Sequence, residues 1–67
     1  MIINAKISLR AARVNAGFTQ KEAADRLLIG TSSLQGYESG KRPPRLDLLG
    51  RMEKLYGIGM QCFRFEE

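Results

Sequence analysis

Hydrophobic and small residues recur at helical spacing in four short blocks of the chain, and glycine or proline separates one block from the next. The first block predicts a helix over about residues 8–16, with its serine as N-cap and Gly17 as C-terminal cap. The second begins at a capping box, in which the side chains of Thr19 and Glu22 each bind the other residue's backbone amide. Its apolar stripe contains two alanines, which predicts close approach of another helix, and it ends at residues 28–29.

A third helix is predicted over Thr31–Glu38, with Leu34 and Tyr37 facing inward and an outward face that is polar but uncharged. Residues 41–44 must then form an extended loop, because proline disfavours helix at the residue before it. A fourth helix is predicted over Leu46–Tyr56, with Gly57 after its end. The expected buried face of this helix consists of Leu46, Leu49, Met52, Leu55 and Tyr56.

The tail from Ile58 to Phe65 is apolar enough to pack as a short helix or strand. Its apolar members, which could belong to the core or to a dimer seam, are Met60, Cys62, Phe63 and Phe65. Together these elements predict an all-α fold, a compact bundle of four to five short helices. The expected organisation is a single domain over residues 1–67, with a possible dimerisation tail at 58–67.

Composition narrows the chemistry that this bundle can support. The chain has 67 residues, 43% of them hydrophobic, which suits one small folded domain. A net charge of +4 favours an anionic partner. With no histidine and only Cys62, the sequence argues against a structural zinc site, an internal disulfide and an activated catalytic thiol. The longest apolar runs are three residues, so we expect a cytoplasmic protein without a membrane span.

The second and third predicted helices, joined by about three residues, form a helix-turn-helix arrangement over about residues 19–39. The segments that follow this pattern are Thr19-Gln20-Lys21-Glu22-Ala23-Ala24-Asp25-Arg26-Leu27, Ser32-Ser33-Leu34 and Tyr37-Glu38-Ser39-Gly40-Lys41-Arg42-Pro43-Pro44. In these segments the chain closely resembles the lambda repressor/Cro-like, or Xre, family of helix-turn-helix proteins, over about residues 7–63.

The resemblance implies a five-helix DNA-binding domain whose third helix lies in the major groove. By position, it implies base contacts from Thr31, Ser32, Gln35 and Gly36. It implies phosphate contacts from Gln20, Ser33, Lys41, Arg42 and Arg45. Arg13 and Glu38 match a pair that joins the first helix to the end of the third in family members. The implied partners are double-stranded DNA and a second copy of the chain, with no catalysis, cofactor, metal or small-molecule substrate.

The side-chain chemistry agrees with this interpretation. Gln35 can form a bidentate contact with adenine, and the Thr31 methyl can touch a thymine methyl. Lys41, Arg42 and Arg45 can grip phosphates without regard to sequence. The function predicted from the sequence is therefore a transcriptional regulator, a repressor of the phage or mobile-element type, that binds a near-palindromic operator as a dimer.

Three residues depart from the family pattern. Leu28 stands in the turn where a left-handed glycine is common, which costs a residue with a side chain about 1 kcal/mol or more. Gly30 replaces the usual serine or threonine cap of the third helix. Gly36 lacks the long polar side chain that many relatives carry, which predicts fewer specific contacts.

An alternative function remains open at this point. The chain could be a protein-interaction module, such as an antitoxin-like or antirepressor component, with secondary DNA binding. The absence of a side chain at Gly36 and the net negative charge of residues 20–39 are compatible with it. An affinity that does not change with salt concentration would favour this alternative, because phosphate-driven binding weakens steeply as salt concentration rises.

Overall fold

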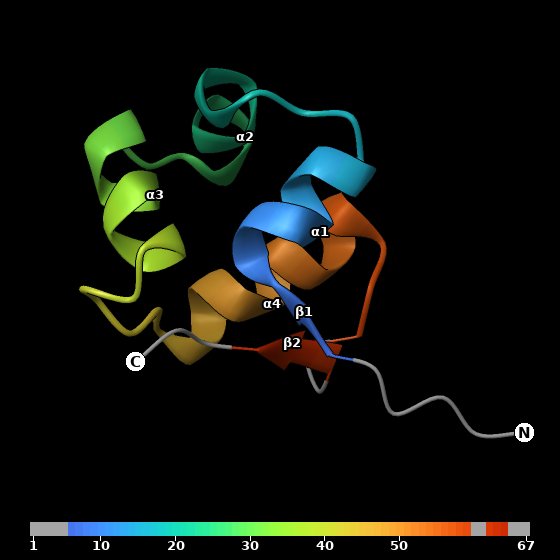
Figure 1. The fold of residues 1–67 in the computed structure, drawn as a ribbon. Coiled ribbons are helices and arrows are strands. Elements are labelled where there is room, and N and C mark those ends of the chain that lie inside the picture. The colour runs from blue at the N-terminus through green and yellow to red at the C-terminus, as the bar shows by residue number, and fades with distance from the viewer. Residues whose placement is uncertain (1–5, 60–61, 65–67) are drawn as a thin grey trace, which may run out of the picture.

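The computed structural model describes residues 6–59 and 62–64 (Figure 1). The elements, in chain order, are β1 (Ile7–Ser8), α1 (Leu9–Asn15), α2 (Gln20–Leu27), α3 (Thr31–Glu38), α4 (Leu46–Tyr56) and β2 (Phe63–Arg64). The fold is therefore mostly helical, with α2 and α3 together on one side of α1 and α4 (Figure 1). None of the helices in the described part of the chain is long and apolar enough to cross a membrane.

Side-chain caps set the start of the first two helices, as the sequence predicts. The Ser8 hydroxyl accepts a hydrogen bond from the Ala11 amide at 3.0 Å. The capping box of α2 is complete, since the Thr19 hydroxyl accepts from the Glu22 amide at 3.1 Å and the Glu22 carboxylate from the Thr19 amide at 2.9 Å. The hydrogen bonds with Thr19 lower the pKa of Glu22 below its ordinary value, because they favour the charged carboxylate.

The core lies where all four helices meet. Its buried hydrophobic residues are Leu9, Ala12, Ala23, Ala24, Leu27, Leu34, Leu48, Met52, Tyr56 and Phe63. The two alanines of α2 are 0% and 1% exposed, so this helix approaches its neighbours closely. It packs against both α3 and α4, and thereby holds α3 in place on the bundle.

The expected buried face of α4 was wrong at its first turn. Leu46 is 72% exposed, whereas Leu48 is 5% exposed and belongs to the core. Residues two positions apart on an α-helix differ by about 200° around the helix axis, so Leu46 and Leu48 point in nearly opposite directions. The row of residues formed by Leu48, Met52 and Tyr56 faces the core, which leaves Leu46 in solvent.

A short parallel ladder joins the two ends of the described chain at the end of the molecule away from α2 (Figure 1). Ile7 pairs with Phe63, and Ser8 pairs with Arg64. The packing tail expected near Phe63 is present as a strand, with Phe63 3% exposed. Met60 and Phe65 lie outside the described residues, and a fifth helix is not among the elements of residues 6–59 and 62–64.

Candidate nucleic-acid interface

Residues 28–30 form the turn that sets the angle between α2 and α3. Leu28 is left-handed, with φ of 63° and ψ of 39°, at a position where its side chain is 80% exposed. This conformation costs a non-glycine residue about 1–2 kcal/mol. The Arg51 guanidinium of α4 donates a hydrogen bond to the Leu27 carbonyl at 3.3 Å, which ties the C-terminal end of α2 to α4.

A buried ion pair joins α1 to the end of α3. Arg13 Nε donates to Glu38 Oε2 at 2.7 Å and Arg13 Nη2 donates to Glu38 Oε1 at 3.3 Å, with 8% and 5% of the two side chains exposed. Arg13 Nη1 also donates to the Phe18 carbonyl at 2.9 Å, in the segment that leads into α2. One arginine therefore holds α1, the start of α2 and the end of α3 together.

Gln20 extends this network from the buried pair to the exposed surface. Its Nε2 donates to Glu38 Oε1 at 3.0 Å, and its Oε1 accepts from Gln35 Nε2 at 3.3 Å. The chain of contacts therefore runs from Arg13 through Glu38 and Gln20 to Gln35 on the outer face of α3. This chain of contacts orients the amide of Gln35, for which the resemblance implies a contact with a base.

The outer face of α3 is polar and accessible. Thr31, Ser32 and Gln35 are exposed, whereas Ser33 and Gly36 are half-buried. Gly30, the N-cap residue, makes no side-chain cap, so the first amides of α3 have no side-chain partner there. Amides at a helix N-terminus favour anionic groups such as phosphates.

The loop after α3 places its cations beside this face. Lys41, Arg42 and Arg45 are all exposed. The first two line a shallow depression of about 420 Å³, whose other lining residues are Ser32, Gln35, Gly36 and Ser39. Arg45 instead lines a separate depression beside Asp47 and Arg51 of α4. The structure thus gathers most of the expected contact residues around α3, with Arg45 to one side.

Two features of this surface had no signal in the sequence. The Ser39 hydroxyl donates to the Gly36 carbonyl at 3.2 Å, which ties the end of α3 to its middle. Arg42 lies directly over Gly36, because a Cβ placed on that glycine would meet Arg42 Cδ at 3.3 Å. Glycine and arginine are six positions apart, and only the course of the loop brings them together.

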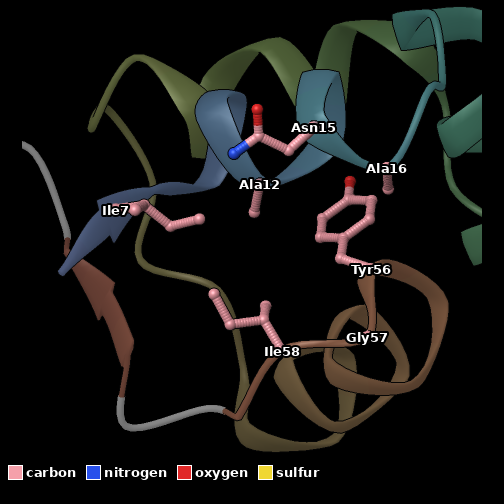
Figure 2. Close-up of a pocket in the computed structure, with 7 residues that line it drawn as sticks. All are labelled: Ile7, Ala12, Asn15, Ala16, Tyr56, Gly57 and Ile58. Atoms are coloured by element: carbon pink, nitrogen blue, oxygen red, sulfur yellow. The ribbon is translucent and has the colours of Figure 1, made fainter. Parts of the chain in front are cut away.

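A second hollow lies away from α2 and α3, between β1, α1 and the end of α4 (Figure 2). Its volume is about 190 Å³, and its lining residues are Ile7, Ala12, Asn15, Ala16, Tyr56, Gly57 and Ile58. The Tyr56 hydroxyl points toward α1 (Figure 2), and it is buried without a hydrogen-bond partner among the described residues. Burial, and next the charge of Glu38, raises the pKa of Tyr56 to about 12. This hollow contains none of the expected contact residues.

The described residues contain few clustered metal-binding side chains. No group of three or more histidine, cysteine, aspartate or glutamate side chains within residues 6–59 and 62–64 could hold a metal ion. The titratable and hydrogen-bonding groups of the α3 face are hydroxyls, amides and cations. Such groups suit the recognition of an anion with polar edges, which is the chemistry of a nucleic acid.

Comparison with known proteins agrees with this geometry. A family model described as helix-turn-helix matches residues 9–61. The HTH-type transcriptional regulator ImmR of Bacillus subtilis (strain 168) is 46% identical over 50 residues, which cover 75% of this chain. The match spans only 39% of the length of ImmR, so the chain corresponds to less than half of that relative. No solved structure is significantly similar to the chain.

Proposed function

Because the chain belongs to the lambda repressor/Cro-like family of helix-turn-helix proteins, we propose that it is a transcriptional regulator that binds double-stranded DNA sequence-specifically. The observation that carries this proposal is the position of Gln35. Its amide is exposed on α3 and oriented through Gln20 by the buried pair of Arg13 and Glu38. A preorganised amide on a rigid helix is suited to reading a base edge.

In the proposed complex, α3 enters the major groove, which is wide enough to admit an α-helix. Gln35 accepts from and donates to an adenine, while Thr31 and Ser32 offer hydroxyls to neighbouring bases. Each such contact discriminates among base pairs because the major groove displays a distinct set of donors and acceptors for each pair. Gly36 has no side chain of its own to offer a base, and Arg42 from the following loop lies over it.

In the proposed complex, contacts with the DNA phosphates on either side of α3 supply the binding strength. Lys41 and Arg45 approach the backbone from the loop, and Ser33 with the uncapped amides of α3 approaches it from the helix start. Gln20 has one amide hydrogen beyond its bond to Glu38, which is available to a phosphate oxygen. These contacts fix the register of α3 without specifying a sequence.

We further propose that two copies bind a near-palindromic operator and repress transcription by excluding the polymerase, as a phage or mobile-element repressor would. A single module of this size makes few base contacts, so a second copy is needed for high specificity. The proposed unit is one helix-turn-helix domain over residues 1–67, with residues 58–67 as the candidate dimer contact. Binding to a symmetric site places the two α3 helices about one helical turn of DNA apart.

The experiment is a selection from a randomised duplex library with the purified chain at near-physiological salt, followed by sequencing of the retained DNA. We expect an inverted repeat with half-sites about 10–11 base pairs apart. Sedimentation with that duplex should give two chains per site. Retained DNA without an enriched sequence would overturn sequence-specific regulation, and salt-insensitive association with a protein would instead support an interaction module.

A further inference from the structure

Arg42 does not extend from its loop into open solvent but lies along α3. A Cβ on Gly36 would be 3.3 Å from Arg42 Cδ, 3.4 Å from Cγ and 3.7 Å from Nε. The aliphatic part of Arg42 therefore occupies the space that a side chain at position 36 would fill. Its guanidinium therefore starts over α3, and Arg42 lines the same depression as Ser32 and Gln35.

The backbone holds Arg42 in this position from both sides. The amides of Lys41 and Arg42 both donate to the Gly36 carbonyl, at 3.0 and 3.2 Å. Pro43 follows directly, and a residue before proline is restricted to extended conformations. Only the side-chain torsions of Arg42 are then free, and its guanidinium has no hydrogen bond or ion pair with the residues that the structure describes.

We propose that Arg42 reads a base, and that it supplies to the α3 face the long side chain that Gly36 lacks. This inference rests on the proposed docking of α3 in the major groove, and it replaces the phosphate contact expected of Arg42 from the sequence. The planar guanidinium offers parallel donors that match O6 and N7 of guanine. The partner is therefore a guanine close to the base pair that Gln35 contacts.

A base contact and a phosphate contact give different results when the arginine is removed. A phosphate contact contributes equally to every sequence, whereas a bidentate contact to guanine distinguishes that base from the others by about 5- to 150-fold. Arg42 is exposed, so its replacement should leave the fold intact. Circular dichroism of each variant checks this directly.

The test repeats the duplex selection with the wild type, Arg42→Ala, Arg42→Lys and Lys41→Ala. We expect the wild type to select a guanine at one position of each half-site. Arg42→Ala should lose that preference at least fivefold while the other selected positions remain, and Arg42→Lys should lose most of it because an ammonium cannot form the two parallel bonds. Lys41→Ala should weaken all sequences by a similar factor and leave the selected site unchanged.

Two further measurements test whether Arg42 itself contacts the selected guanine. Replacement of the selected guanine by 7-deazaguanine removes its N7 acceptor, so it should weaken the wild type about tenfold and leave Arg42→Ala unaffected. Gly36→Ala should reduce the guanine preference because its methyl displaces the arginine stem, whereas Gly50→Ala, with open space around its Cβ, should not.

The outcomes separate this inference from the function on which it rests. If the wild type selects an operator and Arg42→Ala weakens all sequences uniformly, as Lys41→Ala does, then Arg42 is a phosphate contact and the inference is wrong. If the wild type selects no sequence at all, then sequence-specific binding fails and base reading by Arg42 fails with it. Loss of one guanine preference alone, with an intact fold, supports the proposal.

Discussion

Arg13 and Glu38 are 25 positions apart, and the arginine fork holds both oxygens of the carboxylate, with Nε 2.7 Å from Oε2 and Nη2 3.3 Å from Oε1. Both side chains are more than nine-tenths buried. Gln20 donates to the same carboxylate and in turn accepts from Gln35. The pair is therefore a structural support for the exposed face of α3 as well as a link between helices.

Removal of one partner should destabilise the fold strongly. Arg13→Ala leaves the carboxylate of Glu38 buried without its cation, and we expect a loss of about 3–5 kcal/mol in the free energy of unfolding, measured by urea denaturation. Arg10→Ala, an exposed arginine of the same helix, is the matched control and should change stability by less than about 0.5 kcal/mol. The double variant Arg13→Met/Glu38→Leu should recover much of the loss, because no unpaired charge remains. Equal stability of Arg13→Ala and Arg10→Ala would contradict this reading of the pair.

The left-handed turn residue offers a stabilising substitution. Leu28→Gly relieves the strain at φ of 63°, and the exposed leucine side chain contributes little packing, so we expect a gain of up to about 1 kcal/mol. For a domain of this size the gain corresponds to a rise of about 4–8 °C in Tm, measured by thermal denaturation. Leu28→Ala keeps the strain and should show no gain. A leucine side chain that stabilises the turn would instead make both variants less stable.

Stability at alkaline pH should depend on Tyr56. Its pKa is raised to about 12 in the folded state, against about 10 in the unfolded chain, so its contribution is complete below pH 10 and is lost between pH 10 and 12. The loss amounts to about 1.4 kcal/mol at pH 11. Tyr56→Phe lacks this loss, and at pH 7 it should be at least as stable as the wild type, because the buried hydroxyl has no partner in the described residues. Urea denaturation of both proteins at pH 8 and pH 11 measures the difference, and parallel declines would refute it.

The salt dependence of DNA binding should show whether the cations of the loop after α3 contact phosphates. If Lys41 contacts a phosphate, Lys41→Ala should reduce the slope of log K against log salt concentration by about 0.9. Lys54→Ala removes the same charge from the last turn of α4 and should leave the slope nearly unchanged. Fluorescence anisotropy with the selected duplex over a range of salt concentrations gives both slopes. Equal slopes for the two variants would exclude a phosphate contact by Lys41.

The parts of the fold that the sequence predicted are those set by neighbouring residues. The capping box of α2 joins residues three positions apart, and Ser8 caps α1 over the same distance, so both helix starts could be located from the sequence. The buried face of α4 was less certain because its first turn contains three leucines, and periodicity alone does not fix the rotation of the helix. The packing against the other elements buried Leu48 and left Leu46 exposed.

Contacts between distant parts of the chain could not be predicted in the same way. The sequence correctly predicted that the outer face of α3 is polar. The contacts of this face with DNA remain predictions. The position of Arg42 over Gly36, however, depends on the course of a loop with two prolines. The hydrogen bond from Gln20 to Glu38 likewise requires the angle between α2 and α3, which the left-handed Leu28 helps to set.

The ladder between Ile7 and Phe63 also determines the order in which the fold can be completed during synthesis. Translation at about 5–20 residues per second exposes β1 several seconds before β2 exists. The capped helices α1 and α2, of seven and eight residues, can begin to form in that interval but gain most of their stability from packing, since isolated helices this short are marginal in water. The pairing partner of β1 arrives only after α4, so the nascent chain must keep its first strand unpaired until nearly all of the domain has left the ribosome.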